Sequence, residues 1–282
     1  MAKKIIVTGG AGFIGNSLVK ELVRRNYDVY SFDIKKGNVS EVKYYTVDLR
    51  DREQLENLIH EVNPETIVHL GGLIKGSYEE LYSVNVLGTK NILDSYKGRV
   101  IFISTGMVYQ GNKSPYNEEM LTNPIDDYPR TKKMAEDFCL QRNNTVIIRL
   151  SLVYGPEQNS PMFISDLGKK IENKEVFRMT KGEQKRDFVH IKDVCEAFCI
   201  LLENNERGIF NISYGDNISM QDLVKLVKKI KGDFKVEQTI PYRDNELWNY
   251  LLSREKARVV LGWEPKISLE EGLSDVFSES AR

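Results

Sequence analysis

The sequence lacks any strong excess of charge and any long apolar run. Its 40 Lys and Arg stand against 41 Asp and Glu, which gives a net charge of −1. A chain without a basic surplus has no overall attraction to nucleic acid or to anionic membranes. No apolar run approaches the roughly 18 residues of a membrane-spanning helix. We therefore expect a protein that binds neither nucleic acid nor membrane.

Cysteine and histidine are scarce, with three of each in 282 residues. The cysteines are odd in number and lie in apolar helical patterns, which indicates reduced core thiols rather than disulfides: Cys139, Cys195 and Cys199. The three histidines show no metal-ligand spacing: His60, His69 and His190. His190 lies on an apolar strand pattern and is expected to be structural. The apolar run at the N-terminus stops at a glycine turn, which favours a first strand over a secretory signal. We expect a cytoplasmic protein without a metal site.

Apolar strand patterns alternate with helical patterns through the first half of the chain. The expected strands are 4–8, 28–33, 43–48, 66–70, 99–104 and 145–150. The helices expected between them include 51–62, about 80–97 and a helix that contains Lys132. This alternation predicts an α/β fold with a doubly wound parallel sheet of the Rossmann type.

The pattern changes from about Leu152, where helices mix with short strands. The helices expected there are 162–173, 192–204 and 219–230, and the strands lie near 176–179, 187–191, 208–212 and 235–240. We predict a dinucleotide-binding domain over residues 1–151 and a smaller α/β lobe for the substrate over 152–282. The boundary is approximate, and elements of the two parts are expected to interleave.

A glycine-rich stretch, GGAGFIG at 9–15, follows the first expected strand and opens a helix. It fits Gly-x-Gly-x-x-Gly from Gly10 and Gly-x-x-Gly-x-x-Gly from Gly9. Glycines let the backbone approach a pyrophosphate, and the helix N-terminus offers free N–H groups to the phosphates. An ordinary glycine turn is the alternative, but the strand before the loop and the helix after it favour a dinucleotide site.

Two acidic residues at strand ends are candidates for contacts with the adenosine. Asp33 follows Gly15 at close to the spacing of roughly 20 residues expected for a carboxylate on the ribose. Such a carboxylate would repel a 2′-phosphate and predicts NAD, although Lys35 and Lys36 could screen a phosphate and keep NADP open. Asp48, which precedes Leu49, could approach the adenine amino group or could cap the next helix.

Tyr128 and Lys132 in YPRTK are one helical turn apart and share a face. A free tyrosine has a pKa near 10, and a neighbouring ammonium and a nicotinamide charge would both favour the phenolate. Thr105 ends an expected strand and could bond the same substrate oxygen. The three would handle the proton of an alcohol while a cofactor takes the hydride. A Tyr–Lys pair with this spacing is common by chance. It indicates a catalytic site here because it follows a predicted dinucleotide-binding loop.

Further motifs cover nearly the whole chain: TGGAGFIG at 8–15, VDL at 47–49, HLGG at 69–72, VNVLGT at 84–89, ISTGMVYQG at 103–111, RLSLVYGP at 149–156, RDFVHIKDV at 186–194 and LGWEPKISLEEGL at 261–273. With YPRTK, they show that the sequence resembles the extended short-chain dehydrogenase/reductases that act on nucleotide sugars, often called the epimerase/dehydratase family. The combination is highly specific for the family and less specific for one member.

The resemblance implies roles for the matching positions. Thr105, Tyr128 and Lys132 match the catalytic Ser/Thr, Tyr and Lys. Positions that match the cofactor site are Gly9, Gly12, Phe13, Ile14, Gly15, Leu70, Gly71 and Asn85. Arg186 and Arg243 match arginines that touch the substrate diphosphate or its nucleoside, with surface salt bridges as the alternative. The resemblance also implies a homodimer built from helices at about 85–97 and 128–142.

The chain departs from the family pattern directly after Thr105. Members that eliminate water across C5 and C6 of the sugar carry Asp-Glu there, and this chain has Gly106 and Met107. Elimination needs an acid and a base near those carbons, so a 4,6-dehydratase is disfavoured. Leu152 also replaces an Asn that contacts the phosphates in many members, and the loop at 73–85 is short, which suggests a trimmed substrate pocket.

Three functions remain after these departures. The first is a nucleotide-diphosphate-sugar 4-epimerase, in which Tyr128 is the acid/base and the hydride goes to NAD and returns. The alternative is a 4-keto-sugar 4-reductase that uses NADH or NADPH and the same three residues. The third is a dinucleotide-binding sensor without catalysis, which the intact Thr, Tyr and Lys set disfavours.

Overall fold

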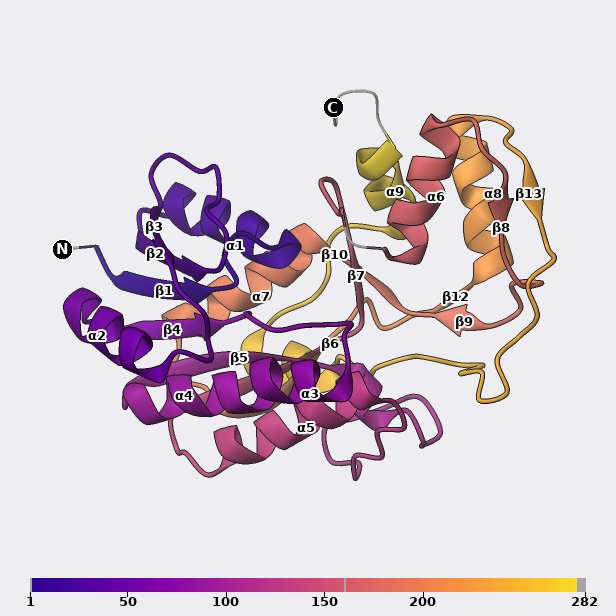
Figure 1. Ribbon diagram of the computed structural model, residues 1–282. Coiled ribbons are helices and arrows are strands. Elements are labelled where there is room, and N and C mark those ends of the chain that lie inside the picture. The colour runs from indigo at the N-terminus through magenta and orange to yellow at the C-terminus, as the bar shows by residue number, and fades with distance from the viewer. Residues whose placement is uncertain (1, 160, 278–282) are drawn as a thin grey trace.

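Seven parallel strands form the centre of the protein (Figure 1). The computed structural model describes residues 2–159 and 161–277. The strands run in the order β11-β6-β5-β4-β1-β2-β3. Their bounds are β1 (Lys4–Thr8), β2 (Asp28–Asp33), β3 (Lys43–Thr46), β4 (Thr66–His69), β5 (Arg99–Thr105), β6 (Thr145–Leu150) and β11 (Gly208–Ile212). This order confirms the predicted Rossmann-type, doubly wound sheet.

Helices cover both faces of the sheet, which explains why its inner strands are almost wholly apolar (Figure 1). On one face, α1 (Phe13–Arg24) and α7 (Ile191–Glu203) share an apolar core with the strands. On the other face, α2 (Arg52–Val62), α4 (Gly88–Ser95) and α5 (Asp127–Leu140) share a second core with them. The fully buried residues Leu18 and Phe198 belong to the first core.

Two elements of the second half of the chain lie in these layers. The sequence pattern placed the helix near 192–204 and the strand near 208–212 in the smaller lobe, and that placement is wrong. β11 pairs in parallel with β6 at the edge of the main sheet, and α7 packs against α1. The reason is that α7 is apolar along most of its length and must be buried against a sheet face. A domain boundary near residue 151 stays a prediction.

The smaller lobe lies beside the sheet and has its own apolar core (Figure 1). Its helices are α6 (Phe163–Glu172), α8 (Met220–Lys231) and α9 (Leu269–Phe277). Its paired short strands are β7 (Leu152–Tyr154) with β10 (Phe188–His190), β8 (Phe177–Arg178) with β13 (Val236–Glu237), and β9 (Lys185–Arg186) with β12 (Ile218–Ser219). A five-residue π-helical segment, η3 (Ala257–Leu261), leads toward α9.

The helix expected at about 80–97 consists of three segments. A capping box between Ser77 and Glu80 starts α3 (Tyr78–Leu81), which continues through the π-helical η1 (Tyr82–Leu87) into α4. The helix stops at Ser95 because Tyr96 adopts an extended conformation. π-Helical turns within α-helices often occur at functional sites. None of the helices within the described residues has both the length and the apolar character needed to cross a membrane.

Candidate active site

The glycine-rich loop lies between the carboxyl ends of β1 and β4, where the strand order reverses and doubly wound sheets bind ligands. Gly9 has a φ of +69°, and a Cβ built on it would lie 2.8 Å from the Cα of Gly71. A Cβ on Gly15 would lie 2.0 Å from the carbonyl oxygen of Gly9. Both positions therefore require glycine. At Gly9 the loop approaches the backbone just after β4, and at Gly15 the first turn of α1 approaches the backbone of the loop itself.

The first residues of α1 present their backbone to this loop. Gly12 is the N-cap and gives the helix no side-chain cap. The N–H groups of Phe13 and Ile14 stand in the first turn, where an α-helix leaves its donors without intrahelical partners. Such a helix end can bind a phosphate, as the sequence predicts.

Asp33 joins the end of β2 to the glycine-rich loop. One carboxylate oxygen accepts the N–H of Ala11 at 3.0 Å, and the other accepts the N–H of Lys35 at the same distance. These bonds fix the carboxylate beside the loop, where it can meet a ribose. The side chains of Lys35 and Lys36 are exposed, and the role of Asp33 in cofactor preference stays a prediction.

Asp48 does not cap the following helix, so that alternative is wrong. The side chain of Asp51 caps α2 by accepting the N–H of Gln54 at 3.0 Å. The carboxylate of Asp48 instead pairs with Arg50, with an Oδ2–Nη2 distance of 2.6 Å. The neighbouring Leu49 is buried, and its side chain fills the space beside two glycines: Gly71 and Gly88.

A buried hydrogen-bond network that the sequence did not reveal supports this side of the site. His69 Nδ1 lies 2.6 Å from Thr8 Oγ1, and its Nε2 lies 3.0 Å from Thr89 Oγ1. Because Thr89 donates its hydroxyl to the carbonyl of Asn85, Nε2 of His69 must carry the hydrogen. Burial lowers the pKa of His69 to about 3. Thr8 in turn accepts the N–H of Gly71, so a neutral histidine fixes the wall of the loop.

Asn85, in the π-helical segment, holds the loop after β4 against the helix of the Tyr–Lys pair. Its amide oxygen accepts the N–H of Leu73 at 2.7 Å. Its amide nitrogen donates to the carbonyl of Leu73 and to Thr131 Oγ1. Leu70 is half-buried at the start of that loop. The side chain of Asn85 thus shapes the cofactor side of the site, and direct contact of Asn85 or Leu70 with a cofactor stays a prediction.

Thr105 and the Tyr–Lys pair stand on neighbouring elements. Thr105 ends β5, is 8% exposed, and accepts the N–H of Met107 at the start of the 3₁₀ turn η2 (Gly106–Tyr109). Lys132 on α5 is 3% exposed, and its Nζ lies 4.1 Å from the centre of the Phe102 ring of β5. Burying an ammonium group whose main contact is the face of an aromatic ring costs free energy. An oxygen atom of a bound ligand would reduce this cost, so the position suits a ligand-binding lysine.

Burial acts on both ionisable members of the pair. It lowers the pKa of Lys132 to about 8 and raises the pKa of Tyr128 to about 12. The sequence led us to expect that the neighbouring ammonium lowers the pKa of Tyr128. In the folded chain burial is the effect that acts on the pKa of Tyr128, and it favours the protonated phenol.

Gly106 has no room for a side chain. A Cβ at this position would lie 2.5 Å from Tyr250 Oη and 2.6 Å from a methyl group of Leu252. Tyr250 is fully buried and donates its hydroxyl to the carbonyl of Leu150 at 3.3 Å. No sequence pattern placed Tyr250 at the site, because Tyr250 and Gly106 are far apart in the chain.

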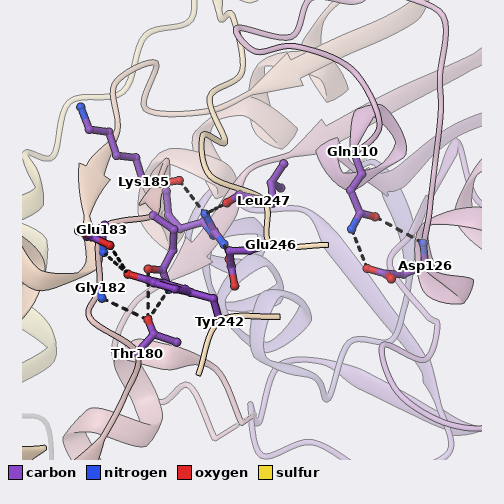
Figure 2. A network of polar contacts seen from close by, with 11 residues as sticks. Gln110, Asp126, Thr180, Gly182, Glu183, Lys185, Tyr242, Glu246 and Leu247 are labelled. Carbon is purple, nitrogen blue, oxygen red and sulfur yellow. Dashed lines mark hydrogen bonds and ion pairs between the residues drawn. The ribbon is translucent and has the colours of Figure 1, made fainter. Parts of the chain in front are cut away.

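Arg186 is the centre of a group of polar contacts in the smaller lobe, and Figure 2 shows the neighbours Lys185, Glu246 and Leu247. Its guanidinium pairs with Glu246 at 2.7 Å, and both side chains are largely buried. It also donates to the carbonyls of Lys185 and Leu247. The salt bridge of Arg186 is therefore internal. The exposed Arg243 lies close enough for its charge to contribute to the lowered pKa of Arg186, after the larger effect of burial.

The remaining histidine and cysteine side chains have structural surroundings. His190 is buried at the end of β10, and its Nδ1 accepts the N–H of Lys192 at the start of α7. The cysteines are buried and unpaired: Cys139, Cys195 and Cys199. Among residues 2–159 and 161–277, no three His, Cys, Asp or Glu side chains gather as metal ligands would.

The geometry agrees with a family comparison. A model of the NAD dependent epimerase/dehydratase family matches residues 5–213, which include the glycine-rich loop, Thr105, Tyr128 and Lys132. The chain belongs to this family. The match includes β11 and α7 as well, in keeping with their place on the main sheet.

Relatives with several reactions match over nearly the full length. A putative UDP-glucose 4-epimerase of Methanocaldococcus jannaschii is 32% identical, over 97% of this chain and 97% of its own. A dTDP-4-dehydro-6-deoxyglucose reductase of Escherichia coli is 28% identical, over 97% and 96%. Mammalian dTDP-D-glucose 4,6-dehydratases match at similar identity. The chain is therefore similar to epimerases, to a reductase and to dehydratases, and overall similarity does not choose among them.

A solved structure shows the same architecture with ligands present. MoeE5, in complex with UDP-glucuronic acid and NAD, superposes with a TM-score of 0.90 at 27% identity, covering 97% of each chain. This likeness extends over the sheet and the smaller lobe together.

Proposed function

We propose that the chain is a nucleotide-diphosphate-sugar 4-epimerase that uses NAD. The observation that carries the proposal is a complete Thr105, Tyr128 and Lys132 set beside a Gly106 position closed to any side chain. This combination supports redox chemistry at one carbon and leaves out an acid at residue 106.

The residues at the carboxyl ends of β1, β2 and β4 fit NAD. Gly9 and Gly15 leave a backbone cradle that a Cβ would fill, and the carboxylate of Asp33 is fixed beside it. NAD, when bound, would accept a hydride from C4 of the sugar and return it. The carboxylate disfavours a 2′-phosphate, and NADP is the alternative cofactor.

Each member of the set has its own task in the proposal. The hydroxyl of Tyr128 exchanges a proton with the C4 oxygen, and Thr105 hydrogen-bonds the same oxygen. The buried ammonium of Lys132 favours the phenolate when Tyr128 must accept a proton, and it can hold the nicotinamide ribose. A positive nicotinamide would add to this effect and offset the burial that raises the pKa of Tyr128.

The smaller lobe is proposed to bind the diphosphate and nucleoside. Arg186 and Arg243 carry like charges close to each other, and guanidinium groups bind phosphates through paired hydrogen bonds. The carboxylate of Glu246 holds Arg186 in place. Leu152 offers no polar group to the phosphates, so these two arginines would supply most of the charge.

A 4,6-dehydratase is disfavoured on steric grounds, although dehydratases are among the relatives. An acidic side chain at position 106 would overlap the hydroxyl of Tyr250 and a methyl group of Leu252. The half-buried Met107 packs with the same tyrosine in one apolar cluster. Neither residue after Thr105 supplies the acid that elimination needs.

A 4-keto-sugar reductase is the second candidate. Two observations favour it: the E. coli reductase among the relatives, and the pKa of Tyr128, which burial raises to about 12. A protonated phenol is ready to donate a proton to the C4 oxygen as a hydride arrives. The exposed Lys35 and Lys36 leave room for NADPH in this reaction.

The deciding experiment identifies the cofactor and then the reaction. The cofactor is released from purified protein, and the protein is incubated with UDP- and dTDP-hexoses and with a 4-keto nucleotide sugar. NAD that co-purifies, with interconversion of C4 epimers and no net NADH, supports the epimerase. Stoichiometric consumption of NADH or NADPH with the keto sugar supports the reductase. Binding of a dinucleotide without turnover of any of these compounds would favour the sensor.

We also propose a homodimer formed through α3 to α4 and α5. Large apolar side chains on these helices are exposed in the single chain: Tyr78, Leu87, Met134 and Leu140. Their burial against the same helices of a second copy would form a four-helix interface. Analytical ultracentrifugation checks this: Leu87→Glu should give monomers, and a dimer that persists in this variant would contradict the proposed interface.

A further inference from the structure

Gln110 and Asp126 form a reciprocal contact at the start of the Tyr–Lys helix, and Figure 2 shows this pair. The amide nitrogen of Gln110 donates to a carboxylate oxygen of Asp126 at 2.8 Å. The backbone N–H of Asp126 donates to the amide oxygen of Gln110 at 3.4 Å. Gln110 is 7% exposed, so its amide is committed to this contact. We call these two bonds the Gln110–Asp126 clamp.

The clamp joins the two elements that carry the proposed acid/base set. Gln110 ends the 3₁₀ turn that begins after Thr105. Asp126 is the N-cap of α5, and Tyr128 follows two residues later. The carboxylate of Asp126 makes no capping bond to its own helix. It points to Gln110 instead, so it fixes the position of the helix and not only its start.

The residue next to Gln110 holds the same helix farther along. The hydroxyl of Tyr109 accepts a hydrogen bond of 2.6 Å from Arg149, and Arg149 pairs with Glu136, one turn beyond Lys132. Two adjacent residues of the turn therefore fix α5 on both sides of the segment that carries Tyr128 and Lys132.

We propose that Gln110 and Asp126 are positioning residues, which set the hydroxyl of Tyr128 against that of Thr105. The catalytic part of this inference rests on the proposed function. A displacement of about 1 Å at a reacting group can reduce a rate about 100-fold. Loss of the clamp should therefore lower kcat and leave cofactor binding at the glycine-rich loop and Asp33 unchanged.

A polarity reversal tests the clamp. Gln110→Glu places two carboxylates face to face, whereas Gln110→Glu combined with Asp126→Asn restores a donor and an acceptor with the roles exchanged. In the single variant Asp126→Asn, the two amide side chains at residues 110 and 126 can still form a hydrogen bond with each other. Asp127→Asn is the matched control, because it removes the same charge at the next residue, which faces Arg130 at 3.5 Å. Gln110→Met, which removes the bonds without adding charge, is the second variant if Gln110→Glu does not fold.

The first readout needs no substrate. A 3-fluorotyrosine is placed at residue 128 of the full-length protein, and its ¹⁹F signal is compared among the variants. The signal should shift in Gln110→Glu and in Gln110→Met, return in the double variant, and stay at the parent position in Asp127→Asn. A signal unchanged in Gln110→Met, or not restored in the double variant, would overturn the proposal.

The second readout is turnover with the substrate found for the parent protein. Gln110→Glu should lose about 10- to 100-fold in kcat, with the Kd for NAD within about two-fold, and the double variant should regain most of the loss. A shifted ¹⁹F signal with parental kcat would overturn the catalytic role of the clamp. If the parent turns over no nucleotide sugar, the proposed function fails, and the ¹⁹F comparison still decides whether the clamp positions Tyr128.

Discussion

At the scale of single residues, burial determines the protonation of the proposed acid/base set. Tyr128 and Lys132 share a helical face, and burial favours the neutral form of each. The phenol therefore begins as a proton donor. Its use as a base depends on charge brought by a ligand, which would couple proton transfer to the presence of an oxidised cofactor.

Replacement of Tyr128 by Phe should remove this proton transfer. We expect kcat to fall by about 10² to 10⁴-fold, with little change in the Kd for NAD, measured by single-turnover kinetics and by titration. Tyr96→Phe is the control, since burial raises the pKa of Tyr96 to about 12 as well and its hydroxyl binds the carbonyl of Pro64. Parental turnover in Tyr128→Phe would mean that another group carries the proton.

His69 should make the protein less stable in acid. Its pKa is lowered to about 3 by burial, so between pH 6.5 and 3 the unfolded chain binds more protons at this residue than the folded chain. Its contribution to stability is complete above pH 6.5 and decreases as the pH falls. At pH 5 the decrease amounts to about 2 kcal/mol.

Urea unfolding at pH 7 and pH 5 measures this effect. The loss of unfolding free energy between these pH values should be about 2 kcal/mol smaller in His69→Gln than in the parent protein. An equal loss in both proteins would show that His69 is not the group responsible.

At the scale of elements, α5 depends on contacts that reach it from the turn after β5 and from β6. Its polar residue Glu136 is fully buried and forms a two-point ion pair with Arg149 of β6. The ring of Tyr109 covers the guanidinium. The helix that carries the Tyr–Lys pair is thus fixed from inside the protein, which leaves its other face available for contact with a second copy.

Breaking this buried pair should be costly. Arg149→Met leaves the carboxylate of Glu136 buried without a partner, and we expect about 3–5 kcal/mol of destabilisation. Lys133→Met breaks a surface pair with Asp137 on the same helix and should cost less than about 1 kcal/mol. Denaturant unfolding of both variants at pH 7 compares them, and equal losses would contradict the assigned burial of Glu136.

For the molecule as a whole, the residues proposed to bind the cofactor and those proposed to bind the substrate belong to different parts. The proposed cofactor residues follow β1, β2 and β4, whereas Arg186 and Glu246 belong to the smaller lobe. Two paired short strands connect the two parts: β7, which follows β6, and β10, which leads into α7. A dinucleotide bound at the proposed cofactor residues should stabilise the folded chain.

Thermal unfolding with dinucleotides measures that stabilisation. At about 100 times its Kd, NAD should contribute about 2.7 kcal/mol, which raises the Tm by about 5–10 °C for a chain of this size. The same concentration of NADP should raise the Tm less, because its 2′-phosphate would meet the carboxylate of Asp33. A larger shift with NADP would assign the site to the other cofactor.

The sheet, the glycine-rich loop and the Tyr–Lys face could be predicted from the sequence. These features depend on local patterns: apolar runs that end at turns, glycines where the backbone comes close, and a four-residue helical spacing. Strand and helix bounds were therefore correct to within a few residues for most elements, as for Asp28–Asp33 and Thr145–Leu150.

The surroundings of those features could not be predicted and came from the folded chain. It placed β11 and α7 on the main sheet, closed the space at Gly106 with Tyr250, paired Arg186 with Glu246 and joined Gln110 to Asp126. It also buried Tyr128, which raises a pKa that the ammonium and a nicotinamide charge were expected to lower. Each of these outcomes depends on burial or on contact between residues far apart in the chain, and no local pattern encodes either.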